Sequence, residues 1–108
     1  MRGRLLLSGA AALFAAAAAG AAQAATIEVV VDKLAFAPAD IQARVGDTIR
    51  WRNKDAFVHS ATAGGAFDVD LPVGRAGTAT LREPGTIEYV CRQHPNMRGR
   101  ITVAPLNP

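Results

Sequence analysis

The sequence predicts an all-β fold, an antiparallel sandwich of short strands. From residue 26 onward, apolar residues recur at every second position over short segments, which is the period of a half-buried strand. Turn-forming Gly, Pro, Asn and Asp separate these segments at close intervals, and no stretch of useful length shows the helical period. Short strands with frequent turns are typical of a two-layer antiparallel sandwich.

The strands can be expected in order along the chain. Thr26–Val31 is rich in β-branched residues, which favour strands. Ile87, Tyr89 and Cys91 alternate with polar neighbours, so Cys91 is expected at the end of a strand. Tyr89 and Trp51 have large aromatic side chains, and we predict that both are buried in the core. The expected strands lie at residues 26–31, 41–45, 49–51, 56–62, 78–82, 87–91 and 100–103.

Turn chemistry indicates where these strands end. Pro84 and Gly85 occupy the second and third positions of a four-residue segment, which suits a type II turn. Residues 64–72 contain two glycines and a proline, so we expect irregular backbone there. Asp68 and Asp70 lie in this segment and are interpreted as solvated loop charges.

The N-terminal segment is expected to lie outside the fold. Arg2 and Arg4 precede the apolar stretch Leu5–Ala21, and Ala22-Gln23-Ala24 fits an A-x-A cleavage site. We therefore expect residues 1–24 to be a cleaved secretory signal peptide, residues 25–108 to form a single domain, and the protein to be periplasmic. An uncleaved membrane anchor is the alternative, because the apolar stretch approaches spanning length.

Charge and cysteine content exclude some function classes. The chain has 12 basic and 9 acidic residues, and two of the basic ones lie in the predicted signal, so the remaining domain is nearly neutral. No basic run alternates with aromatic residues, so nothing indicates nucleic-acid binding. One cysteine cannot form an internal disulfide. A bound metal would both protect this thiol and stabilise a small domain.

The potential metal ligands form one pattern. The sequence has one cysteine, two histidines and two methionines, one of which is Met1. Cys91, His94 and Met97 follow at steps of three between two expected strands, and His59 lies on an earlier strand. Two imidazoles, a thiolate and a thioether are the ligand set of a blue-copper electron-transfer site. The pattern therefore predicts one copper ion held by these four residues, and a one-electron carrier that is not an enzyme.

Three other interpretations use the same residues. Zinc would accept the cysteine and histidines, but structural zinc sites do not normally include methionine. A periplasmic copper-binding or trafficking protein, a chaperone or store without redox turnover, would use the same ligands. An enzyme with Cys91 as nucleophile and His94 or His59 as its base would leave Met97 unexplained.

Several motifs resemble those of a known family. Cys91-x₂-His94-x₂-Met97, Val45-Gly46-Asp47-Thr48 with Trp51, and Glu83-Pro84-Gly85-Thr86 before Tyr89 resemble the small blue copper proteins, the cupredoxins. The short spacing between His94 and Met97 is similar to that of the amicyanin type, whereas plastocyanins have longer loops.

The resemblance implies a fold and a set of roles. The family fold is an eight-stranded Greek-key sandwich. His59, Cys91 and His94 would be equatorial ligands of a type 1 copper and Met97 the axial one. An edge of His94 would reach the surface within an apolar patch, to which Pro95 and Leu71-Pro72-Val73 would contribute. Redox partner proteins, an electron donor and an acceptor, would dock there on a monomer with no stable membrane association.

One residue departs from the family pattern. The first ligand histidine is usually followed by an asparagine that locks the two ligand-bearing loops together, but here Ser60 follows His59. Because serine is shorter, we expect it to replace only part of that role.

Overall fold

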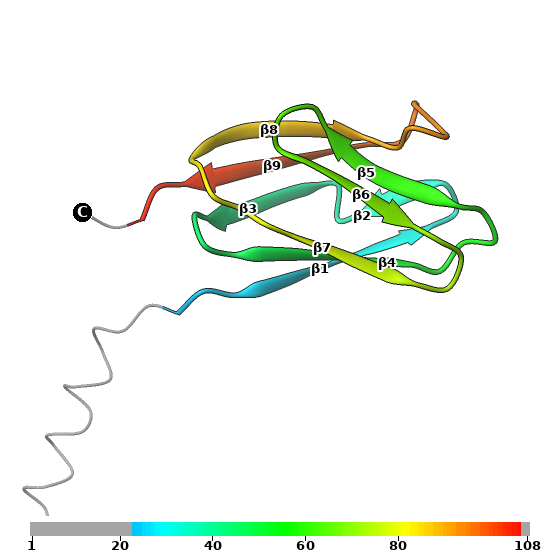
Figure 1. Ribbon diagram of the computed structural model, residues 1–108, viewed down its shortest axis with the longest axis horizontal. Helices are drawn as coiled ribbons and strands as arrows, with labels where there is room; N and C mark the ends of the chain where they lie inside the picture. The colour runs from blue at the N-terminus through cyan, green and yellow to red at the C-terminus, as the bar shows by residue number, and fades with distance from the viewer. Residues whose placement is uncertain (1–22, 107–108) are drawn as a thin grey trace, which may run out of the picture.

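The computed structural model describes residues 23–106. Segments in which apolar side chains alternate with polar ones form short strands (Figure 1). The predicted signal peptide lies almost wholly outside the described residues. The nine strands are β1 (Thr26–Asp32), β2 (Ala35–Ala37), β3 (Asp40–Arg44), β4 (Thr48–Asn53), β5 (His59–Ala63), β6 (Phe67–Leu71), β7 (Ala76–Thr80), β8 (Gly85–Val90) and β9 (Arg98–Ala104).

The strands pair as two sheets that pack face to face. One sheet has the order β2-β1-β4-β7 and the other β3-β9-β8-β5-β6. The predicted all-β sandwich is therefore confirmed. Two neighbouring pairs, β1 with β4 and β3 with β9, are parallel, whereas antiparallel pairing was expected. Parallel neighbours need a crossover connection, and here the chain passes through the opposite sheet between the two strands of each pair.

The segment expected to be irregular contains a strand. β6 pairs with β5 from His59↔Leu71 to Ala63↔Phe67, so Asp68 and Asp70 are strand residues and not loop charges. Conversely, the strand expected from residue 56 begins only at His59, because residues 54–58 form the connection from β4. That connection passes beside the candidate site.

The core between the sheets is built around two aromatic residues. Trp51 and Tyr89 are fully buried, as predicted, and the Trp51 indole Nε1–H donates to the Tyr89 hydroxyl at 3.1 Å. Burial raises the pKa of Tyr89 to about 12. Gly99 is the cross-strand partner of Tyr89, and its missing side chain leaves room for the ring.

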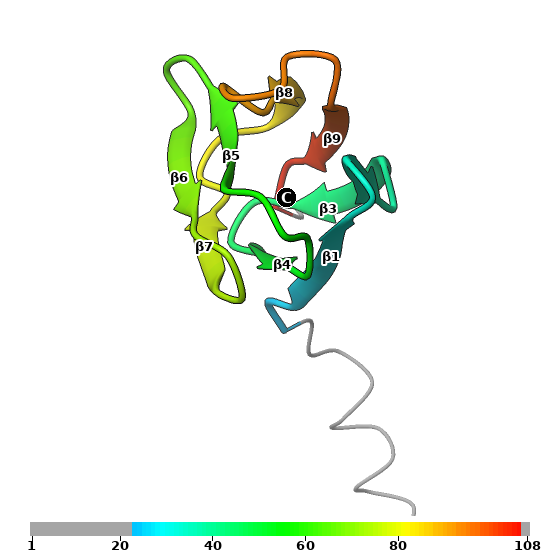
Figure 2. The same ribbon diagram turned by 90° about the vertical axis from the view of Figure 1, so that its right-hand side faces the viewer.

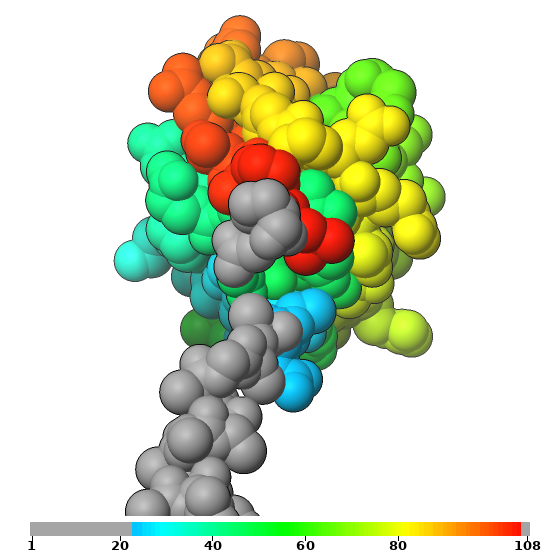
Figure 3. All heavy atoms as spheres, turned by 90° about the vertical axis from the view of Figure 1, so that its left-hand side faces the viewer, coloured from blue at the N-terminus to red at the C-terminus, as the bar shows by residue number. Residues whose placement is uncertain are grey.

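The two ends of the sandwich differ. The Cys91–Met97 loop joins β8 to β9 at one end, and Figure 2 looks onto that end, with this loop in orange above the green connection from β4 to β5. At the opposite end the C-terminal residues, in red, lie beside the start of β1 and the β7–β8 connection (Figure 3). There the buried Asp47 carboxylate accepts the backbone N–H groups of Ala25 and Arg44, which lowers its pKa.

Within residues 23–106 no helix is long and apolar enough to cross a membrane.

Candidate metal centre

Cys91 is held at the start of a tight loop. It follows β8 directly, and its backbone N–H donates to the Met97 carbonyl at 3.2 Å. The Met97 N–H donates to the His94 carbonyl at 2.9 Å, so the loop is closed upon itself. Cys91 and Met97 are both buried, whereas His94 is half-buried. The loop therefore presents a sulfur from inside the protein and an imidazole that reaches the surface.

His59 reaches the same place from another strand. It is the first residue of β5, it is fully buried, and it lies 32 residues before Cys91 in the chain. Its Nδ1 is 3.5 Å from the Cys91 Sγ, and the His94 Nδ1 is 3.8 Å from the same sulfur. The donor atoms of all three residues lie within 4.8 Å of one another.

These separations suit a single metal ion. A nitrogen and a sulfur bound to one ion at about 2.0 and 2.3 Å are about 3.5–3.8 Å apart when the angle between the bonds is roughly 110–120°. The two N···S distances in the structure fall in this range. Two imidazoles and one thiolate also match the trigonal donor set of type 1 copper. The residues present therefore fit the copper ion that their types predict.

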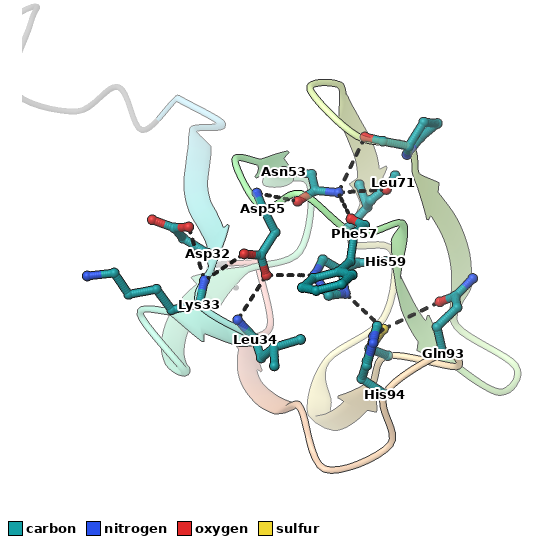
Figure 4. Close-up of polar contacts among 12 residues, drawn as sticks. Asp32, Lys33, Leu34, Asn53, Asp55, Phe57, His59, Leu71, Gln93 and His94 are labelled. Atoms are coloured by element: carbon teal, nitrogen blue, oxygen red, sulfur yellow. Dashed lines mark hydrogen bonds and ion pairs between the residues drawn. The ribbon is translucent and has the colours of Figure 1, made fainter.

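A carboxylate fixes the orientation of the His59 ring. The Asp55 Oδ2 accepts the His59 Nε2–H at 2.8 Å (Figure 4). The other ring nitrogen, Nδ1, is then the one that faces the Cys91 sulfur. Asp55 also accepts the backbone N–H groups of Lys33 at 3.0 Å and Leu34 at 2.9 Å. The Leu34 amide and then His59 lower the pKa of Asp55, which keeps it ionised.

The turn that binds Asp55 has an unusual backbone. Lys33 and Leu34 have φ values of 53° and 58°, the left-handed region that non-glycine residues seldom adopt. This conformation suits the tight turn between β1 and β2 and aims two successive N–H groups at one carboxylate. Through Asp55, a turn of one sheet is thus tied to a histidine of the other.

Asn53 holds the connection that carries Asp55. Its side-chain amide donates to the Phe57 carbonyl at 2.8 Å and the Leu71 carbonyl at 2.9 Å, and its oxygen accepts the Asp55 N–H at 2.9 Å. Asn53 is almost completely buried. It therefore fixes both Asp55 and the loop that leads to His59 (Figure 4).

Exposed apolar side chains lie at the same end of the sandwich as His94. The Phe57 ring lies 5.8 Å from the His94 ring between centroids, and about half of the Phe57 side chain is exposed. We call the exposed apolar residues on the connections at this end of the sandwich the apolar rim; they are Phe57, Val58, Pro72, Val73 and Pro95. Leu71 was expected there but is fully buried in the core. It is the last residue of β6, pairs with His59 of β5 and faces inward.

Sequence reasoning did not find all of these residues. Asp55 was not among the candidate site residues, although its spacing of four residues before His59 is a signal that could have suggested a contact. Phe57 was not assigned to the apolar patch. Ser60 does contact the ligand loop, since its Oγ accepts the Arg92 N–H at 2.9 Å.

Comparisons with known proteins agree with this geometry. A family model described as a cupredoxin-like domain matches residues 5–103. Amicyanin of Paracoccus denitrificans is 35% identical over 92 residues, which cover 77% of this chain and 70% of that protein. Amicyanin-alpha of Methylorubrum extorquens is 31% identical over 89 residues, which cover 76% of this chain and 75% of that protein.

Solved structures give the same relationship. The Cu(I) form of an amicyanin point mutant matches with a TM-score of 0.68 at 31% identity, over 80% of this chain and 88% of that one. The crystal structure of amicyanin from Paracoccus versutus matches with a TM-score of 0.64 at 26% identity, over 81% of this chain and 87% of that one. The chain therefore belongs to the cupredoxin-like family, and the relatives it resembles within that family are amicyanins.

Proposed function

We propose that this chain is a periplasmic blue copper protein that transfers one electron at a time between redox partner proteins. The main support is the arrangement of His59, Cys91 and His94, whose donor atoms lie within 4.8 Å of one another at the end of a rigid sandwich. The periplasmic location is supported by the predicted signal peptide. Its test is the fraction of a bacterial host in which the processed chain is recovered.

The ligand roles follow from position and burial. His59, Cys91 and His94 would bind copper in a trigonal set, and the buried Met97 would supply a weak axial thioether. Copper bound there would supply the one-electron Cu(I)/Cu(II) couple. The chain contributes donors that are already oriented, three of them buried, so they need little rearrangement when the charge of the ion changes.

Electrons would enter and leave through His94. Of the two imidazoles, only this one is partly exposed, and it lies within the apolar rim. Apolar surface allows a partner to approach closely without removing water from charged groups. We therefore propose that the donor and the acceptor both dock on the rim, against a monomer.

Electron self-exchange between two copies tests this docking surface. Val73→Asp should slow self-exchange, measured by NMR line broadening of mixed Cu(I) and Cu(II) samples, because two rims would have to desolvate the new carboxylates. Leu106→Asp is the matched control, since Leu106 is also an exposed apolar residue but lies near the opposite end of the sandwich. Equal rates in both variants and the natural chain would refute docking at the rim.

A copper chaperone or store remains the second candidate. It would use the same ligands but needs a site that exchanges its ion readily. The complete burial of His59 and Cys91, and the hydrogen bonds that fix them, favour retention of the ion over exchange. Rapid transfer of copper to a competing chelator, without reversible reduction, would favour the trafficking function.

A further inference from the structure

A group of polar side chains lies on the outer face of β5 and β6 beside the ligand loop. Ser60 and Thr62 alternate along β5, and the strand register places Asp70 opposite Ser60 and Asp68 opposite Thr62. Arg92, the residue after Cys91, extends over both strands, with its Nε 3.0 Å from the Asp68 Oδ1 and its Nη2 2.5 Å from the Asp70 Oδ1.

The direction of each hydrogen bond in this group can be assigned. The Thr62 hydroxyl donates its single proton to the Asp68 carboxylate at 2.8 Å. Thr62 therefore has no proton left for Ser60, so in the 2.9 Å contact between the two hydroxyls Ser60 is the donor. The Ser60 Oγ in turn accepts the backbone N–H of Arg92 at 2.9 Å.

These bonds form a closed ring that begins and ends on one residue. It runs from the Arg92 N–H through Ser60 and Thr62 to Asp68, and returns through the Arg92 guanidinium. We call it the Arg92 ring. Hydrogen bonds that point the same way polarise one another, and this chain ends on a carboxylate that is also paired with a cation.

The position of the ring suggests what it does. The ion pairs of Arg92 with Asp68, inside the ring, and with Asp70, beside it, are exposed, and exposed pairs add little to overall stability. Ser60, however, is fully buried although it lies on the outer face of the sheet, and it contacts the peptide that joins Cys91 to Arg92. The ring therefore contacts the start of the ligand loop directly.

We propose that the Arg92 ring is a positioning device that holds the Cys91 end of the ligand loop closed, even without metal. It supports the hydrogen bond by which the short Ser60 side chain connects β5 to the ligand loop. This inference deepens the proposed copper site and rests on Cys91 being a ligand. Thr62, Asp68 and Arg92 are positioning residues in it, because they act through Ser60 and the loop backbone.

Alkylation of Cys91 in the metal-free protein measures loop opening directly. The side chain is fully buried, so iodoacetamide reacts only when the loop opens, and the rate follows the open population when closing is fast. Thr62→Val removes a hydroxyl without changing charge and leaves the buried Ser60 hydroxyl without its acceptor. We expect alkylation about tenfold faster, which corresponds to about 1.4 kcal/mol, the order of one hydrogen bond.

Two further variants separate the ring from general loosening. Thr62→Ser keeps the hydroxyl and should react at the rate of the natural chain. Thr102→Val changes a half-buried threonine of β9 in the same sheet, outside the ring, and should also leave the rate unchanged. Asp68→Ala, at an exposed position, replaces Thr62→Val should that variant fail to fold, and should likewise accelerate the reaction.

Each outcome decides the proposal. Fast alkylation of Thr62→Val with normal rates for the other two threonine variants supports the ring. A normal rate for Thr62→Val, or equal acceleration in Thr62→Ser or Thr102→Val, overturns it. Because no copper is present, these rates do not depend on the proposed function, which fails separately if the natural chain does not form a redox-active copper site.

Discussion

Replacement of Asp55 by asparagine tests how the protein orients its first histidine. The Asp55 Oδ2 accepts both the His59 Nε2–H and the Leu34 N–H, and the Oδ1 accepts the Lys33 N–H. Asparagine has one acceptor oxygen and one donor group in the same space. Even in its better orientation, its NH₂ group would face the Lys33 N–H, and His59 would exchange a charged acceptor for a neutral one.

The expected loss is in copper affinity. Loss of a partner that orients a metal-bound histidine costs about 10- to 100-fold in affinity. We therefore expect Asp55→Asn to raise the apparent Kd for copper by that factor, with Asp55→Ala at the upper end because it removes every acceptor. The fold should persist, because Asp55 lies on the connection from β4 to β5 and outside the core built around Trp51 and Tyr89.

Competition of the protein with a chelator for Cu(II) gives the apparent Kd. Asp32→Asn is the matched control, since the Asp32 Oδ1 also accepts the Lys33 N–H at 3.0 Å but makes no contact with His59 among the described residues. An unchanged Kd for Asp55→Asn would refute the reasoning. An equal loss in Asp32→Asn would show that the turn matters and that the bond to His59 does not.

Two further predictions concern stability. In Gly99→Ala the new Cβ would lie 2.3–2.5 Å from atoms of the Tyr89 side chain, so we expect a loss of about 1–3 kcal/mol by thermal unfolding, and an unchanged midpoint would contradict this packing. Asp47→Asn should cost about 1–3 kcal/mol by urea unfolding at neutral pH, because the side chain is buried and the amide can accept only one of the two N–H groups of Ala25 and Arg44. Since folding lowers the pKa of Asp47, its contribution is lost as pH falls through the folded-state pKa, and the difference between natural chain and variant should shrink in acid. A difference independent of pH would contradict the role of the charge.

The sandwich and the ligand group were largely predictable from local patterns. Strands β1, β4 and β8 show clear alternation of apolar and polar residues. The sequence has only one cysteine and two histidines, so a metal site built from these residue types has to combine Cys91, His94 and His59. The structure brings those three together as predicted, while their role as copper ligands stays a prediction.

Other features could not be read from local patterns. β6 was missed because glycines and a proline flank it and its outward residues are aspartates, which resemble a loop. The Lys33–Leu34 turn has no glycine or asparagine to indicate its positive φ angles. The Asp55 contacts with this turn and the Arg92 contact with Ser60 join residues 21 to 32 positions apart. They depend on how distant segments are brought together, in the second case by the pairing of β5 with β8, and not on local sequence.

The visible absorption spectrum of the purified protein after addition of Cu(II), with Cys91→Ala as control, tests the central claim most directly. A type 1 site predicts an intense visible band from charge transfer between the thiolate and copper. The band should bleach reversibly on addition of reductant and be missing in Cys91→Ala. A colourless protein that binds Cu(I) but never turns blue would contradict the electron-carrier function.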